Sequence, residues 1–163
     1  MFSGSIPALI TPFNNNEVDY ESFSKIIEWS LSEGSDGFVP CGTTGESPTL
    51  SHEEHKKVVE ECIRVVDKRV PVIAGTGSNS TSEAIEFTKH AEKAGANAAL
   101  VVTPYYNKPT QNGLYAHFNE IAKQTKLPII IYNIPGRSVV DMSINTMIEL
   151  SKIENIIGVK DAT

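Results

Sequence analysis

Lys160 is the residue of this chain with the most distinctive chemistry. It follows the apolar run 156–159, so we expect its amine at the end of a strand. A lysine that projects from a strand end into a closed pocket can lose its proton and attack a carbonyl carbon, forming a Schiff base. For a single lysine, a simpler interpretation is that its amine extends to water. Which of the two interpretations holds depends on the side chains that follow the other expected strands.

Hydroxyl groups and glycines follow the second apolar run, in the segment Gly42–Ser47 with the sequence GTTGES. The glycines allow tight turns, and Thr43 and Thr44 present hydroxyl and N–H groups that can bind a small anion. An ordinary loop explains this segment equally well. A nucleotide-binding P-loop is excluded because the Gly-Lys-Ser/Thr sequence is missing. The segment 75–77 is better interpreted as a turn between a strand and a helix than as a phosphate site.

Phenols and a guanidinium follow the next runs. Tyr105 and Tyr106 come after the fourth run, and Tyr132 and Arg137 belong to the YNIPGR segment after the fifth. Tyrosines often serve only in packing, but a phenol at a strand end can transfer a proton or stabilise developing charge. Arginine offers a planar, bidentate fork to a carboxylate, although most arginines are solvated. With Lys160, the set suits an amine-catalysed carbon–carbon bond reaction on a keto acid.

The elements that must position these groups alternate along the chain. The expected strands are 6–11, 37–40, 70–75, 98–103, 128–133 and 156–160, and the expected helices are 20–32, 52–66, 82–94, 114–125 and 144–152. Two helices begin with the pattern of a capping box, Ser51-x-x-Glu54 and Ser80-x-x-Glu83. The spacing of roughly 30 residues between strands is that of a repeated βα unit.

This alternation predicts an α/β fold with a parallel sheet. A Rossmann sheet is disfavoured because no Gly-x-Gly-x-x-Gly joins the first strand to its helix. Functional groups at the ends of several different strands favour a (β/α)₈ TIM barrel, which typically takes about 250 residues. With six of eight strands visible, we expect residues 1–163 to be the N-terminal part of one barrel domain. The last two βα units and the C-terminal helices would be absent.

Composition excludes several classes of partner. The 163 residues carry a net charge of −6 and contain no basic block that would bind nucleic acid. The apolar runs are too short to span a membrane, and the N-terminus does not have the pattern of a signal peptide. Cys41 and Cys62 form no Cys-x-x-Cys motif. We therefore expect reduced thiols in a cytoplasmic protein.

Three motifs in combination, GTTGE at 42–46, YNIPGR at 132–137 and GVKD at 158–161, resemble those of the dihydrodipicolinate synthase family. This family belongs to the N-acetylneuraminate lyase superfamily of pyruvate-dependent class I aldolases, which are (β/α)₈ barrels. The resemblance runs from about Ile6 to the last residue. It implies a lyase of diaminopimelate and L-lysine biosynthesis. Lys160 would condense with pyruvate, and the resulting enamine would attack L-aspartate 4-semialdehyde.

The resemblance also implies roles for individual residues. Tyr132, Thr43 and Tyr106 correspond to a proton-relay triad in which the second tyrosine comes from the neighbouring subunit. Thr44 resembles the site of the pyruvate carboxylate, and Arg137 the residue that receives the semialdehyde carboxylate. The family needs no metal and no dissociable cofactor, since the imine with pyruvate forms on the lysine itself. Its members typically assemble as homotetramers built from two tight dimers.

Two alternatives stay open. One is another pyruvate aldolase of the superfamily, acting on sialic acid or a keto-deoxy-sugar acid. Such members usually carry Ser-Thr at the positions of Thr43 and Thr44 and lack the arginine, so Arg137 favours the smaller aldehyde. The other is an inactive remnant that at most binds lysine or other subunits. The open edges of its first and sixth strands would favour that alternative.

A second site can be predicted around His52 and His55, which lie three positions apart on one helix. A zinc site is not supported, because no third ligand stands at motif spacing, and a solvated pair of histidines is a simple alternative. The resemblance implies a feedback site for L-lysine. Its residues would be Ser47, Pro48, His52, His55, Asn79, Glu83 and Tyr105. Glu83 would meet the amine of the effector, Asn79 and Tyr105 would hold its carboxylate, and Pro48 stands where alanine is more often found.

Overall fold

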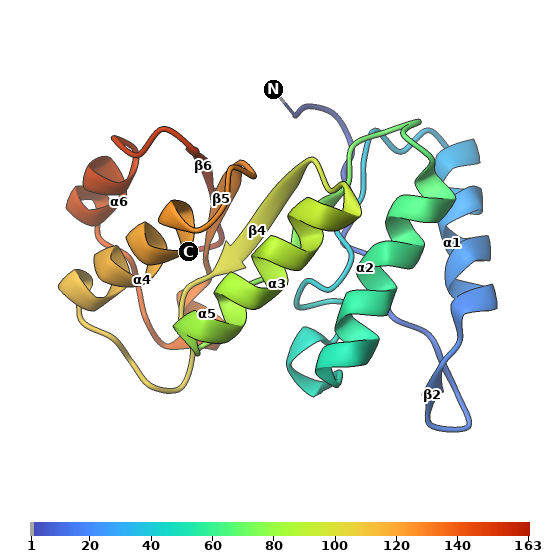
Figure 1. The fold of residues 1–163 in the computed structure, drawn as a ribbon, viewed down its shortest axis with the longest axis horizontal. Coiled ribbons are helices and arrows are strands. Elements are labelled where there is room, and N and C mark those ends of the chain that lie inside the picture. Colours follow the sequence, from blue (N-terminus) through green and yellow to red (C-terminus); the bar gives the residue numbers. More distant parts are fainter. Residues whose placement is uncertain (1) are drawn as a thin grey trace.

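The computed structural model describes residues 2–163. It consists of a curved row of parallel strands with helices along its outer side (Figure 1). The hydrogen-bonded sheet contains β3 (Ile73–Gly75), β4 (Ala98–Val102), β5 (Ile129–Asn133) and β6 (Ile156–Asp161), in that order. All three pairings are parallel. These strands are short apolar runs separated by helices, as the sequence predicts.

The first two expected strands, 6–11 and 37–40, are reduced to isolated parallel bridges. The bridges pair Ala8 with Val39 and Phe38 with Val72. Pro7 and Pro40 explain the difference, because a proline has no N–H group with which to extend a ladder. The two segments nevertheless continue the row of strands beyond β3.

The five expected helices are present with small shifts at their ends. They are α1 (Tyr20–Ser32), α2 (His52–Val66), α3 (Thr81–Ala94), α4 (Gln111–Lys123) and α6 (Ile144–Leu150). They pack side by side in this order along the outside of the strands (Figure 1). The sequence did not indicate four shorter elements: β1 (Phe13–Asn14), β2 (Glu17–Val18), the 3₁₀ turn η1 (Ser47–Thr49) and α5 (Pro135–Ser138). Within residues 2–163, no helix has the length and apolar character needed to cross a bilayer.

One of the two predicted capping boxes is complete. The Ser51 hydroxyl accepts from the Glu54 N–H, and the Glu54 carboxylate accepts from the Ser51 N–H. At α3 only one half of the box forms, in which Ser80 accepts from the Glu83 N–H. The Glu83 carboxylate instead accepts from the Ser78 hydroxyl at 2.7 Å. The side chain of Glu83 is therefore turned away from the backbone of its own cap.

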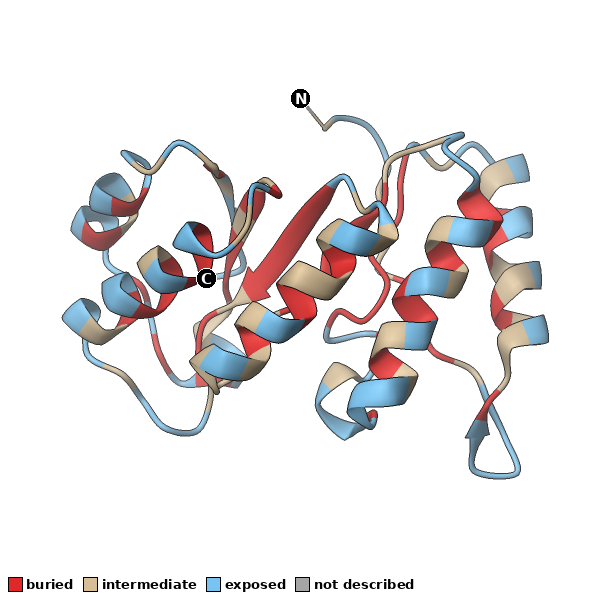
Figure 2. Cartoon of the chain, viewed as in Figure 1, coloured by how far each residue is buried: buried red, intermediate tan, exposed pale blue. Residues whose placement is uncertain are grey.

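Alternate residues of the strands face two separate apolar clusters. The outer cluster, between strands and helices, includes Ala99, Val101, Ile129 and Ile131. The inner cluster contains Val39, Ile73, Ala98, Leu100 and Tyr132. Figure 2 shows buried residues along the strands and on the helix faces that meet them. This period of two directs Tyr132 to the inner face of the sheet.

The pairing of β5 with β6 contains one irregularity. Ile129 pairs with Ile156, but the next residue of β5, Ile130, pairs with Gly158. Ile157 is therefore an extra residue in β6, as in a β-bulge. Because successive side chains point to opposite faces, a shift of one residue changes the face on which every later residue lies.

The shifted register determines where Lys160 lies. After the bulge, Lys160 pairs with Tyr132, and Asp161 pairs with Asn133. Without the shift, Val159 would stand opposite Tyr132 and Lys160 would join the outer face. The amine thus reaches the inner face because the two strands are paired in this register.

Two histidines are buried in the packed parts of the fold. His55 in α2 stacks on Phe87 of α3, with ring centroids 4.0 Å apart. The Nδ1 atom of His117 in α4 lies 2.9 Å from the hydroxyl of Thr81. Burial lowers the pKa of each imidazole to about 4, because the charged form loses its hydration. Both rings are therefore neutral near pH 7.

These histidines predict a loss of stability in acid. The unfolded chain takes up protons at its histidines near pH 6.5, whereas the folded chain does so only near pH 4. Between these values each ring lowers the free energy of unfolding by up to about 1.4 kcal/mol per pH unit as the pH falls. In urea titrations of the 163-residue chain, His55→Leu should reduce this slope, and adding His117→Leu should reduce it further. An unchanged slope in both variants would contradict burial of neutral rings.

Candidate active site

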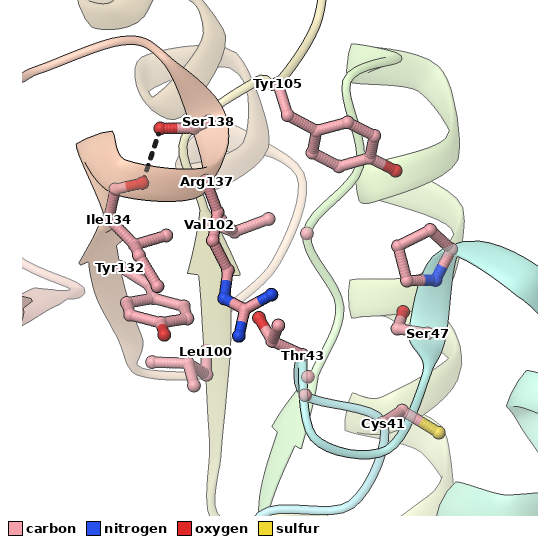
Figure 3. Close-up of a pocket in the computed structure, with 14 residues that line it drawn as sticks. Cys41, Thr43, Ser47, Leu100, Val102, Tyr105, Tyr132, Ile134, Arg137 and Ser138 are labelled. Carbon is pink, nitrogen blue, oxygen red and sulfur yellow. Dashed lines mark hydrogen bonds between the residues drawn. The ribbon is translucent and has the colours of Figure 1, made fainter. Parts of the chain in front are cut away.

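A cavity of about 250 Å³ lies where the carboxyl ends of the strands meet (Figure 3). The residues that line it are Cys41, Gly42, Thr43, Ser47, Pro48, Gly75, Gly77, Leu100, Val102, Tyr105, Tyr132, Ile134, Arg137 and Ser138. Of the predicted catalytic and substrate-binding residues, Thr43, Tyr132 and Arg137 are in this set. The cavity therefore brings together segments that are about 90 positions apart in the chain.

The hydroxyl-bearing loop is a tight turn held by hydrogen bonds within its backbone and by one from the Thr11 side chain. The Gly45 N–H donates to the Gly42 carbonyl at 3.1 Å, and the Thr11 hydroxyl donates to the Gly45 carbonyl at 2.8 Å. Among the described residues, the N–H groups of Thr43 and Thr44 have no acceptor. Both threonines are exposed, although only Thr43 lines the cavity. Adjacent free N–H groups of this kind can bind an anion.

Two glycines allow strands and loops to approach closely at the cavity wall. A Cβ atom on Gly75 would overlap the Cys41 carbonyl, and one on Gly77 would overlap the backbone of Val102. The segment 75–77 is thus required for close packing as well as for the turn into α3. It contributes backbone to the wall of the cavity.

Tyr132 and Arg137 come from one short stretch of chain. Tyr132 is the fourth residue of β5 and is buried, and the single-turn helix α5 begins three residues later. This turn is fixed by the Ser138 hydroxyl, which donates to the Ile134 carbonyl at 2.9 Å. In Figure 3 the Arg137 side chain extends between Tyr132 and Thr43. Within residues 2–163, Arg137 forms no ion pair with a carboxylate, so its guanidinium is available to a ligand.

The Lys160 amine lies over the face of the Tyr132 ring, with Nζ 4.2 Å from the ring centroid. This distance allows a cation–π contact. Lys160 is exposed, and it is not among the residues that line the cavity. In the described sheet β6 has a strand neighbour on one side only, and among residues 2–163 no pocket encloses the amine. Tyr132 is the residue that connects the amine to the cavity.

The two adjacent tyrosines after β4 point to different places. Tyr105 lines the cavity, whereas Tyr106 is 90% exposed and has a left-handed φ of 73°. A non-glycine residue with this backbone conformation is strained. In this chain, therefore, the phenol of Tyr106 is not part of the cavity.

Cys41 is the one thiol at the cavity wall. Burial raises the pKa of this thiol, and its sulfur lies 3.5 Å from the His55 carbonyl oxygen. A thiol that stays protonated is a poor nucleophile. Cys41 therefore contributes to the packing of the cavity wall.

Among residues 2–163, no group of three or more histidines, cysteines or carboxylates is placed to hold a metal ion.

The residues of the predicted lysine site fall into separate groups. Ser47, Pro48 and Tyr105 line the same cavity as Tyr132. His52 and Glu83 lie together, with Nε2 3.6 Å from Oε1. The Asn79 carbonyl accepts from the side chain of Asn107 at 3.0 Å.

His55 does not fit the predicted lysine site in this structure. It is 2% exposed, and neither ring nitrogen has a hydrogen-bond partner among the described residues. Its ring stacks on Phe87, while the ring of the exposed His52 is inclined by 71° to the same Phe87 ring, with centroids 4.9 Å apart. The two histidines lie on the same side of α2, but only His55 is buried in the interface with α3. The spacing of the two residues in the sequence could not show which of them is buried.

The apolar walls of the cavity and the buried amide of Asn133 were not predicted from the sequence. Leu100, Val102 and Ile134 form apolar wall, and the alternation within β4 was a signal for the first two. Asn133 is fully buried at the end of β5, directly after Tyr132, and pairs with Asp161 of β6. A polar residue within an apolar strand was the available signal for Asn133, since a buried amide requires partners.

Comparisons with known proteins find relatives along the whole chain. The family model for the dihydrodipicolinate synthetase family matches residues 1–163. The 4-hydroxy-tetrahydrodipicolinate synthase of Agrobacterium fabrum is 68% identical over all of this chain and 56% of its own length. The chain thus spans about half the length of the curated relatives it matches.

Two solved structures superpose closely. A chloride-inhibited dihydrodipicolinate synthase from Acinetobacter baumannii, complexed with pyruvate, is 56% identical with a TM-score of 0.96, covering 98% of this chain and 55% of that one. An enzyme of the same name from Cyanidioschyzon merolae, with lysine bound, is 42% identical with a TM-score of 0.93, covering 98% and 56%. The prediction of a TIM barrel, of which this chain forms part, is confirmed. Because the family model and the relatives match the chain over all of its residues, the chain belongs to the dihydrodipicolinate synthetase family.

Proposed function

We propose that this chain carries the Schiff-base site of a 4-hydroxy-tetrahydrodipicolinate synthase, which condenses pyruvate with L-aspartate 4-semialdehyde in diaminopimelate and L-lysine biosynthesis. The observation that carries the proposal is the Lys160 amine over the Tyr132 ring, beside a cavity with a free guanidinium. The name of a relative 68% identical supports the reaction, and a pyruvate complex of a structure 56% identical supports the first substrate.

The reaction begins on Lys160. Its unprotonated amine attacks the keto carbon of pyruvate, and the keto oxygen leaves as water, which gives an imine. Loss of a proton from the methyl carbon moves the C–H electron pair toward the imine nitrogen and forms an enamine. The enamine carbon then attacks the aldehyde carbon of the semialdehyde, whose oxygen takes up a proton. The amino group of this second substrate displaces Lys160 from the imine carbon, which closes the ring and frees the lysine.

Proton transfers are assigned to Tyr132, Thr43 and Tyr106. Tyr132 is in contact with the amine, and Thr43 lies on the same cavity. Tyr106 would serve the cavity of a neighbouring subunit, because its ring is 90% exposed on a strained backbone and lies outside its own cavity. This assignment requires an oligomer, and we propose the homotetramer expected for the family.

Two positively polarised groups would hold the substrate carboxylates. The free N–H groups of Thr43 and Thr44 form an anion site for pyruvate. The unpaired guanidinium of Arg137 would receive the carboxylate of the semialdehyde in a bidentate pair. No metal and no dissociable cofactor enters this scheme, because the imine nitrogen itself accepts the electrons of the methyl C–H bond.

The chain as given would supply the N-terminal part of one barrel domain in a cytoplasmic enzyme. Its match to only 56% of a relative supports a requirement for further βα units. Those units would cover the exposed β6 edge and enclose Lys160.

We further propose that L-lysine inhibits the enzyme from a site that includes Glu83 and His52. Their contact at 3.6 Å places a carboxylate for the amine of the effector, and Tyr105 faces the shared cavity near Ser47. A lysine-bound structure of a protein 42% identical supports the ligand. His55 would act by shaping α2 rather than by touching the ligand.

The function can be tested in a fusion of this chain with the part of the Agrobacterium fabrum relative that it does not cover, here called the completed barrel. It should turn over pyruvate with L-aspartate 4-semialdehyde in a coupled assay, and it should not cleave N-acetylneuraminate or keto-deoxy-sugar acids. Turnover of the sugar acids without turnover of the semialdehyde would exclude the proposed reaction.

Arg137→Ala in the completed barrel should raise the KM for semialdehyde while leaving the KM for pyruvate nearly unchanged. Loss of a charge-assisted pair predicts a fall in kcat/KM for semialdehyde on the order of 10- to 100-fold. Arg64→Ala is a matched control, since Arg64 is an exposed arginine paired with Glu61 on α2. Equal effects of Arg137→Ala on both substrates would remove the assigned role.

Millimolar L-lysine should reduce the rate of the completed barrel. Glu83→Gln should raise the inhibitory concentration roughly tenfold or more, because it removes the charge opposite the effector amine. Glu86→Gln on the same helix is the control, since the Glu86 carboxylate is paired with Lys56 at 2.6 Å. Full activity in the presence of lysine would dispose of the regulatory proposal, and equal sensitivity of the two variants would dispose of the role of Glu83.

A further inference from the structure

We propose that Asn133 is a positioning residue for the Schiff-base lysine, and that its side-chain amide holds the end of β6 in the register that places Lys160 over Tyr132. This inference rests on the proposed function, because it concerns how the amine is presented to pyruvate. It is argued from one contact: the fully buried amide of Asn133, directly after Tyr132, is hydrogen-bonded to Asp161, directly after Lys160.

The amide of Asn133 uses both of its hydrogens and its oxygen. Nδ2 donates to Asp141 Oδ1 at 2.8 Å and to Asp161 Oδ1 at 3.0 Å, and Oδ1 accepts from the Met142 N–H at 3.1 Å. Two carboxylates and one N–H group are compatible with only this orientation of the amide. One side chain thus joins three segments: β5, β6 and the loop after α5.

This connection acts on the strand whose register places the amine. β6 has one strand neighbour in the described sheet, and Ile157 and Val159 on it are 51% and 40% exposed. Its register already shifts once, at Ile157, and another shift of one residue would move Lys160 to the outer face. The Ala162 N–H also donates to the Asn133 carbonyl at 2.9 Å, so backbone and side chain of one residue fix this strand end.

The charges around Asn133 make a hydrogen-bond donor necessary at this position. The carboxylates of Asp141 and Asp161 both accept from the same NH₂ group. Removal of the amide would leave two carboxylates close together without their shared donor, and their repulsion would separate the loop from β6. The same loop follows α5, which carries Arg137. Loss of the amide should therefore disturb both the amine and the guanidinium.

The test uses the completed barrel and a signal that depends on the enamine. Formation of the enamine exchanges the methyl hydrogens of pyruvate for deuterium in D₂O, which proton NMR follows without the second substrate. Asn133→Ala should slow this exchange roughly tenfold or more, since misplacement of a reacting group by ~1 Å can lower a rate by on the order of 100-fold. Asp161→Ala, which removes one of the three hydrogen bonds at an exposed residue, should slow it in the same direction.

Asn155→Ala is the matched control. Asn155 stands just before β6, and its amide donates to the Ala122 and Thr125 carbonyls, each at 3.0 Å. It fastens the opposite end of the same strand, so its loss should lower the melting temperature without a comparable loss of exchange. A second test exchanges the two side chains, with Asp at position 133 and Asn at position 161, and is here called the reversed pair. Asn133→Asp should slow exchange, and the addition of Asp161→Asn should recover part of the rate by restoring a donor and an acceptor between the strands.

The outcomes separate this proposal from the proposed function. If the unsubstituted completed barrel exchanges deuterium, but Asn133→Ala and Asn155→Ala slow exchange equally for an equal fall in melting temperature, Asn133 is only structural and the proposal is wrong. Failure of the reversed pair to exceed Asn133→Asp alone would also overturn it. Absence of exchange in the unsubstituted protein would overturn the proposed function, and this inference with it.

Discussion

The parallel pairing of β6 with β5 is the interaction on which the candidate site depends. It sets Lys160 opposite Tyr132, with the amine 4.2 Å from the ring centroid, and the extra residue Ile157 decides which face of the sheet receives that amine. Tyr132 is buried in β5, and the turn that carries Arg137 starts three residues later. The position of the amine relative to Tyr132 is thus set by the register of one strand pair.

Local patterns were sufficient to predict most of the fold. α1 and α2 have the bounds expected from their apolar periodicity, because their amphipathic faces are long. The segments 6–11 and 37–40 were predicted as strands, but they form only isolated bridges because prolines interrupt the ladder. The register shift at Ile157 could not be predicted, since it depends on the pairing of two strands and not on either sequence alone.

The same distinction applies to the site. Thr43, Tyr132 and Arg137 could be placed together because each lies near the carboxyl end of an expected parallel strand, and such ends meet on one side of a sheet. His55 could not, because its burial depends on how α2 packs against Phe87 of α3. The connections of Asn133 join three segments, so they too became visible only in three dimensions. Residues that act through tertiary contacts leave little trace in local sequence.

The most direct measurement is chemical trapping of the imine. The completed barrel would be incubated with pyruvate, reduced with borohydride, digested and analysed by mass spectrometry. We expect a reduced pyruvate adduct on the peptide that contains Lys160, and no adduct in Lys160→Ala. An adduct on a different lysine, or no adduct in the active unsubstituted protein, would contradict a Schiff base on this strand.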